Sequence, residues 1–389
     1  MTAWTSLRKP LGLLAAVLFT AALCTGCDYN DIDHLLFSSG IGVDRLQDHL
    51  RLSVDLVQPG GAGNPAMGSN SGSGGPNQAL DEIVSADAST FEEAMSAIQS
   101  KLSHALYLQH NAVVLFSQDA LRHFTSIADA LERHRQLRRS QLWVVTPRSA
   151  EQIFRQSPGR VEPVSLVLRD LVDEASRREM CLASDELHVV KSLLRPSGVA
   201  SLAVIDQGQD GSPELRGLAY LRRDGKVYIV DNDRLLNHAW WLGRTLDVRE
   251  AVPWKVTQGE ATVGLHWLRT STRVIAQGSS ASPSIRVVWR GTAEIERWAG
   301  GRTMSAAAFH ALETAARRDI ERRLQDALNE VRTADMDAFG LTNACVQKGL
   351  HVSEEAWKRV PVVYDVEPHI VQGQLAASTP FSSDTSGRG

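Results

Sequence analysis

Apolar residues recur along this chain with two periods, every second residue in the expected strands and about every 3.6 residues in the expected helices. Leucine or valine occupies every second position of residues 50–56, the pattern of a half-buried strand. An apolar stretch at 36–43 precedes it across a polar gap, so the two segments predict an antiparallel hairpin. Glycine, serine, asparagine and proline dominate residues 59–78, and this composition predicts a mobile loop.

A helical rhythm follows. Thr90 and Glu93 fit a capping box, and apolar residues continue from it at helical spacing. The uncharged residues 112–116 predict a buried strand, residues 119–138 a second helix, and residues 142–145 another strand. Helices and strands in this alternation predict a βαβ-like unit that shares a mixed sheet with the hairpin.

In the second half of the chain the predicted elements change from helices to strands. Two amphipathic helices are expected at 166–181 and 185–194, and strand patterns dominate from residue 199 onward. Asp224-Gly225 predicts a hairpin turn. Residues 305–332 form the longest expected helix, apolar on one side and charged on the other, so we expect it to cover a sheet or a partner.

The chain begins with the layout of a secretory signal. Arg8-Lys9 precedes an apolar run at 11–23, which is too short to span the ~30 Å core of a bilayer. Gly26 directly before Cys27 predicts cleavage there and lipidation, with an S-diacylglycerol and an N-palmitoyl group on Cys27. The alternative is an ordinary secretory signal, which leaves Cys27 as a free or disulfide-bonded thiol.

Together these patterns predict an α+β fold: a body of two to three domains, with mixed sheets and packed helices, behind a lipidated N-terminus. The expected parts are a signal peptide at 1–26, an N-terminal mixed α/β domain at 28–160 with the mobile loop 59–78, a helical connector at 161–198, a C-terminal α+β domain at 199–375 with the long helix 305–332, and a disordered tail at 376–389.

Composition and charge argue against some classes of function. The chain has 389 residues, 43% of them hydrophobic and 22% charged, and its net charge of -4 argues against a dedicated nucleic-acid binder. After Cys27 only Cys181 and Cys345 remain, and they could pair or stay as buried free thiols. No cysteine or histidine cluster has the spacing of a metal site, so we expect neither a metal nor a cofactor.

No motif of a known catalytic class is present, which favours a protein that is not an enzyme, although dispersed catalytic residues leave no local signature. His110 lies between an expected helix and a buried strand, where it could act as a base or simply pack. Trp240 and Trp241 could form a ligand platform or belong to the core. These three are the weak candidates for ligand binding.

Several segments together resemble the Ger(x)C proteins, the lipoprotein C subunits of spore nutrient germinant receptors. The matching segments, in order, are Cys27-Asp28, Gly40-Ile41-Gly42-Val43-Asp44, Phe91-Glu92-Glu93-Ala94, residues 108–116, Arg133 to Arg139, Leu142-Trp143-Val144-Val145, Asp337-Ala338-Phe339-Gly340 and Trp357. The chain departs from the family pattern at Cys24, where leucine is common, at Gln109, where glycine is usual, and at Asp28-Tyr29, where Trp-Asp is usual.

The resemblance implies a non-catalytic lipoprotein on the outer face of the spore's inner membrane. It would assemble there with an A-type and a B-type membrane subunit and help to assemble the receptor or relay the nutrient signal for germination. Two alternatives remain open. One is an extracytoplasmic solute-binding lipoprotein with a ligand against Trp240 and Trp241, and the other is a secreted hydrolase.

Overall fold

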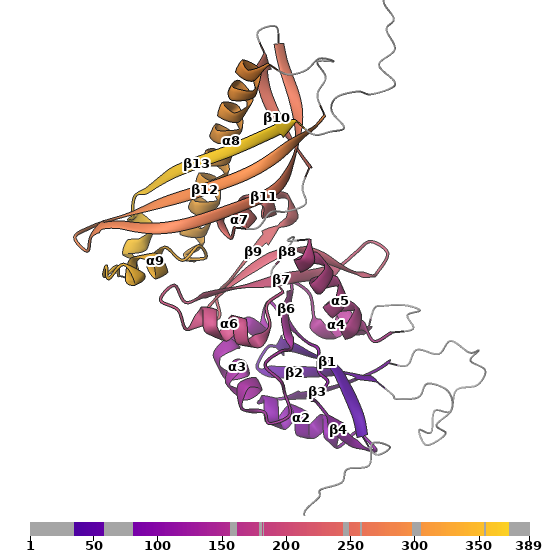
Figure 1. The fold of residues 1–389 in the computed structure, drawn as a ribbon. Helices are drawn as coiled ribbons and strands as arrows, with labels where there is room; N and C mark the ends of the chain where they lie inside the picture. Colours follow the sequence, from indigo (N-terminus) through magenta and orange to yellow (C-terminus); the bar gives the residue numbers. More distant parts are fainter. Residues whose placement is uncertain are drawn as a thin grey trace, which may run out of the picture.

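The computed structural model describes residues 35–57, 81–155, 162–178, 181, 183–243, 249–256, 259–297, 305–353 and 355–372. Two lobes are visible in Figure 1, each built on one mixed sheet with helices packed against it. The α+β prediction is confirmed. The expected signal peptide, the loop 59–78 and the tail 376–389 lie outside the described residues.

The first sheet has nine strands in the order β3-β2-β1-β5-β6-β7-β8-β9, with β4 beside β1. Its middle is parallel, since β1, β5, β6 and β7 run in one direction. The predicted hairpin is confirmed as the antiparallel pair of β1 and β2. The strands are β1 (Leu35–Leu46), β2 (His49–Val57), β3 (Asp81–Ala88), β4 (Ala105–Tyr107), β5 (Val113–Ser117), β6 (Leu142–Thr146), β7 (Val199–Gln207), β8 (Pro213–Arg222) and β9 (Val227–Asp231).

Helices cover both faces of this sheet, which explains why β5 and β6 are apolar throughout. Val114 and Phe116 pack on one side and Val113 and Leu115 on the other. The first side carries α2 (Phe91–Gln99), η2 (Ala120–His123), α3 (Phe124–Arg133) and α6 (Glu186–Leu193), and the second carries α4 (Ala150–Arg155) and α5 (Val164–Arg177). Thr90 caps α2 as predicted, because its Oγ1 accepts from the Glu93 amide at 3.2 Å, while the Glu93 carboxylate accepts from the Ser89 amide and not from that of Thr90.

The structure differs from the sequence prediction in the place where the first sheet ends. Strands β7, β8 and β9 lie in the first sheet, although residues 199–231 were assigned to the C-terminal domain. Residues 161–198 are not a connector between domains, because α5 packs on the sheet and α6 leads into β7, which returns parallel to β6. The β8–β9 hairpin turns at Asp224-Gly225 as predicted, with a φ of 87° at Gly225.

The second lobe is a four-stranded sheet in the order β10-β11-β12-β13, covered by one long helix. The helix expected at 305–332 is confirmed, and Ser305 caps it by accepting from the Ala308 amide. The elements are α7 (Asn232–Trp241), β10 (Arg249–Val256), β11 (Gly259–Ser279), β12 (Ser282–Arg297), α8 (Ala306–Ala334), α9 (Leu341–Gln347), η3 (Ala356–Arg359) and β13 (Val362–Gln372).

A continuous apolar core joins the two lobes. Leu218, Tyr220 and Val230 of the first sheet belong to the same cluster of buried side chains as α7, α8 and the second sheet. Polar contacts close the junction at its rim: Arg222 Nη1 lies 2.5 Å from Asp335 Oδ2, and the Ser197 amide donates to Asn343 Oδ1 at 2.9 Å. Among the described helices, none is long and apolar enough to cross a membrane.

Candidate functional site

A pocket of about 300 Å³ opens beside the N-terminal ends of β5 and β6, the parallel strands in the middle of the first sheet. Three segments supply its polar lining: the loop before β5, the loop before β6, and the exposed side of α5. The polar residues that line it are Gln109, His110, Asn111, Arg138, Ser140, Arg169 and Asp173.

Asn111 fixes the strand ends below this pocket. Its side chain is buried, accepts from Ser38 Oγ at 3.1 Å and donates to Gln141 Oε1 at 2.6 Å. Gln141 Nε2 in turn donates to Glu186 Oε2 at 2.7 Å. Burial raises the pKa of Glu186, although the bond from Gln141 opposes that shift. This chain of bonds ties β1, β5, β6 and α6 together, so Asn111 belongs to the framework of the pocket.

His110 lies at the exposed rim of the pocket, beside an aromatic pair. Its ring centroid is 5.6 Å from that of Phe37 and 5.6 Å from that of Tyr107. The Tyr107 hydroxyl donates to Gln109 Oε1 at 2.7 Å, which holds Gln109 beside it. The rim is therefore partly aromatic.

The charged groups of the lining come from two elements. Arg138 is exposed, and in the described part of the chain no carboxylate lies within ion-pair distance of it. Arg169 Nη2 pairs with Asp170 Oδ1 at 2.9 Å, and Asp173 follows one helical turn after Arg169. Two guanidinium groups and one carboxylate thus face the same small volume.

A second polar cluster lies at the lobe junction around Glu330 of α8. Glu330 Oε2 accepts from the Tyr228 hydroxyl at 3.1 Å, from Arg234 Nη1 at 3.3 Å and from His238 Nε2 at 3.1 Å. Tyr220 Oη lies 3.2 Å from His238 Nδ1. With its proton on Nε2, His238 donates to Glu330 and accepts from Tyr220, so the neutral ring satisfies both partners. Burial lowers the pKa of His238, and Glu330 opposes this shift.

This cluster predicts a loss of stability on acidification. The pKa of His238 is lower in the folded protein than its ordinary value near 6.5, so the unfolded chain binds the proton more tightly. Stability from this group is complete above about pH 6.5 and falls as the pH drops from there through the lower folded pKa. Thermal unfolding between pH 7.5 and 5 is expected to show this fall, and His238→Gln is expected to flatten it.

The control for that measurement is His123→Gln, because the side chain of His123 is exposed and lies in the first lobe, at the end of η2. A pH profile that the His238 substitution leaves unchanged would contradict the assignment of the fall to the lobe junction.

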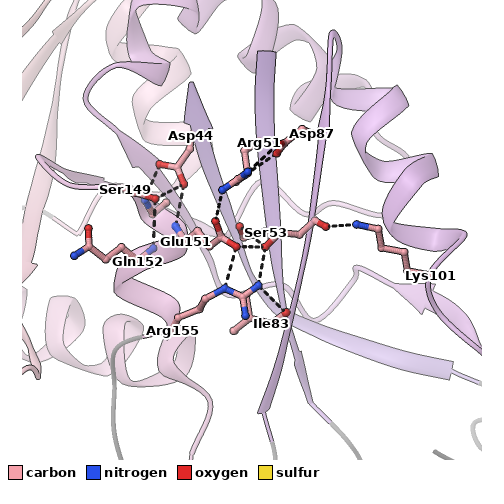
Figure 2. Close-up of polar contacts among 12 residues, drawn as sticks. Asp44, Arg51, Ser53, Ile83, Asp87, Lys101, Ser149, Glu151, Gln152 and Arg155 are labelled. Carbon is pink, nitrogen blue, oxygen red and sulfur yellow. Dashed lines mark hydrogen bonds and ion pairs between the residues drawn. The ribbon is translucent and has the colours of Figure 1, made fainter. Parts of the chain in front are cut away.

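A third polar cluster joins α4 to the first hairpin (Figure 2). Asp44, at the end of β1, accepts from the Ala150 amide at 2.7 Å and from the Glu151 amide at 2.9 Å, and so caps α4. Arg51 of β2 pairs with Asp87 at 2.6 Å and with Glu151 at 2.8 Å. All these carboxylates have partners within the chain, so we assign the cluster a structural role: it holds α4 against β1, β2 and β3.

Comparison with known proteins relates this architecture to spore germination. Residues 28–207 match the family model described as spore germination protein N-terminal domain. The chain is 20% identical to spore germination protein KC of Bacillus subtilis (strain 168) over 385 residues, which cover 92% of each protein. Its fold is similar to the crystal structure of the GerBC protein, with a TM-score of 0.51 and 14% identity, over 88% of this chain and 100% of that one.

Residues 28–207 therefore carry the N-terminal domain of the spore germination protein family. These matches confirm the resemblance to the Ger(x)C proteins found in the sequence, and they support a role in spore germination. The structure also explains the family motif Gly40-Ile41-Gly42-Val43-Asp44. A Cβ atom on Gly40 would lie 2.3 Å from Ser165 Cβ, and one on Gly42 would lie 3.0 Å from Phe154 Cε2, so the glycines admit α5 and α4. Asp44 caps α4.

The structure separates the residues that sequence analysis singled out. His110 lines the pocket, whereas Trp240 and Trp241 are 1% and 4% exposed and lie in the core of the second lobe. The tryptophan pair therefore presents no platform to solvent. Cys181 and Cys345 are both buried and no disulfide joins them; the Cys181 thiol lies 3.7 Å from the Val172 carbonyl oxygen. Cys27 lies outside the described residues.

Sequence reasoning missed Arg138, Arg169 and Asp173. Arg138 is the last residue of the helix predicted at 119–138, but α3 ends at Arg133 and Arg138 lies in the loop beyond it. The spacing of Arg169 and Asp173 by four residues does place both on one side of α5, and this was an available signal. In the described part of the chain, no three His, Cys, Asp or Glu side chains converge as a metal site would require.

Proposed function

We propose that this chain is a membrane-anchored lipoprotein subunit of a spore nutrient germinant receptor. Its role would be to assemble the receptor or relay its signal, without catalysis. The observation that carries the anchor is the start of the family match at residue 28, directly after Cys27 and the signal-like segment. Similarity to spore germination protein KC over 92% of both chains supports a role in spore germination for the whole body.

The proposed location is the outer face of the spore's inner membrane, with Cys27 carrying the lipid. The proposed partners are the A-type and B-type membrane subunits of the receptor. The solute-binding alternative loses its main argument, because it placed the ligand against Trp240 and Trp241, which are buried.

Cys27→Ala is expected to move the protein from the membrane fraction to the soluble fraction of spores, and to abolish the nutrient response that depends on it. The three acyl chains of a diacylglyceryl, N-palmitoyl cysteine supply most of the attachment in this proposal, because about 0.8 kcal/mol is gained per buried methylene and the substituted chain has none. Fractionation with immunoblotting and the loss of optical density after nutrient addition measure the two effects.

Cys181→Ala is the matched control, since it removes a buried thiol of the body and leaves the anchor intact. The proposal fails if the Cys27 variant is made at normal levels, stays with the membrane and germinates like the parent.

A further inference from the structure

We propose that the pocket at the start of β5 and β6 binds the headgroup of a membrane phospholipid. The chemical class is a phosphate joined to a primary ammonium, as in phosphoethanolamine. The phosphate would lie between Arg138 and Arg169, and the ammonium would lie at Asp173. The inference rests on the proposed anchor at Cys27, which brings this end of the body to a membrane.

The length of chain before β1 keeps the pocket near the anchor. Only residues 28–34 separate Cys27 from Leu35, the first residue of β1. Eight extended steps of ~3.6 Å span at most about 29 Å. Phe37, the third residue of β1, lies 5.6 Å from the ring of His110 at the pocket rim. A lipid on Cys27 therefore holds this rim within reach of the headgroups.

The orientation of the first lobe agrees with this placement. β4 pairs with the first three residues of β1 and, in Figure 1, lies at the end of the first lobe remote from the second lobe. The second lobe consequently extends away from the side at which the anchor joins the body.

The charges of the lining select the ligand. A guanidinium group binds phosphate through paired, charge-assisted hydrogen bonds, and Arg138 has no carboxylate within ion-pair distance among the described residues, whereas Arg169 also contacts Asp170. Ser140 adds a hydroxyl donor to the same lining. The carboxylate of Asp173 would repel a ligand that is only anionic, whereas it complements an ammonium a few ångströms from the phosphate.

Size and surroundings favour a headgroup over a free solute. A volume of about 300 Å³ is at the small end of ligand pockets, enough for a headgroup whose acyl chains remain in the bilayer. Tyr107 and Phe37 flank the rim, and the ring of Tyr107, which combines an apolar body with a polar hydroxyl, is suited to the membrane interface. A free amino acid has the same pair of charges, and it is therefore an outcome of the test.

The test uses residues 28–389, which contain both apolar cores complete and lack the signal and the lipid. Flotation measures binding to vesicles of phosphatidylcholine alone and with added phosphatidylethanolamine or phosphatidylglycerol. We expect binding to require phosphatidylethanolamine. Arg138→Gln and Arg169→Gln should each weaken it about tenfold, the usual effect of losing one charge-assisted contact. Arg177→Gln, on the same helix outside the pocket, should not change it.

Three results would overturn the inference. Equal binding to vesicles that contain phosphatidylglycerol, lost equally in all three variants, would show general electrostatic attraction. Thermal stabilisation by free glycine or inorganic phosphate without vesicle binding would identify a solute pocket. No binding to any probe would show that the pocket has no such ligand. Because the tested chain carries no lipid, each result is independent of whether Cys27 anchors the protein.

Discussion

Gly40→Ala is expected to destabilise the first lobe by about 3 kcal/mol, the upper part of the usual range for overpacking a core. The new Cβ would lie 2.3 Å from Ser165 Cβ, a separation that two carbon atoms cannot adopt. Ser165 has no room to move, since its Oγ lies 2.7 Å from Ser39 Oγ and 2.6 Å from Asp55 Oδ2 in a fully buried network. Denaturant titration followed by circular dichroism measures the change.

Gly42→Ala is the matched comparison in the same strand. Its Cβ would meet Phe154 Cε2 at 3.0 Å and Ala150 Cβ at 3.1 Å, contacts that shifts of a few tenths of an ångström relieve. It is therefore expected to cost less than Gly40→Ala. Equal unfolding midpoints for the parent and the Gly40 variant would show that α5 does not pack on β1 as described.

Trp240→Ala is expected to lower the free energy of unfolding by about 3–5 kcal/mol, as large aromatic truncations in cores do. Trp240 contacts two further tryptophans edge to face, with ring centroids 5.8 Å from Trp267 and 5.5 Å from Trp289. The Arg323 guanidinium carbon lies 5.7 Å from the Trp240 ring, and this cation–π contact would also be lost. Thermal unfolding of the intact body measures the effect.

Trp240→Phe is the control, because it keeps an aromatic ring in the same space and should cost clearly less. If Trp240→Ala left the stability unchanged and instead abolished the binding of a nutrient, the tryptophan pair would be a ligand site after all and the core assignment would be wrong.

Much of the fold could be predicted because its signals are local. The alternation in β2, the capping box of α2 and the apolar side of α8 each lie within one segment, and each predicted the correct element. The boundary of the first sheet could not be found in this way. It depends on the pairing of β6 with β7, in which Val144 and Val145 face Ala203 and Val204 from almost sixty residues away.

The candidate site likewise combines a residue that local sequence indicates with residues that only the tertiary structure brings together. The sequence alone indicates His110 as a candidate, because it lies between a predicted helix and a predicted buried strand. Its neighbours Arg138 and Arg169 come from segments that no local pattern connects, and only the packing of α5 on the sheet brings them together. For Trp240 the sequence left core and ligand platform open, since a buried and an exposed aromatic pair look alike until their surroundings are known.

The order of strands in the first sheet also determines how this protein can be divided. The segment matched by the family model ends at Gln207, the last residue of β7. A fragment cut there loses β8, which pairs with the whole length of β7, and leaves a row of unsatisfied backbone amide and carbonyl groups. It also uncovers Val199, which otherwise packs against α7 and the second lobe. The matched segment is thus a unit of sequence similarity, whereas the sheet to which it belongs includes β8 and β9 and reaches Asp231.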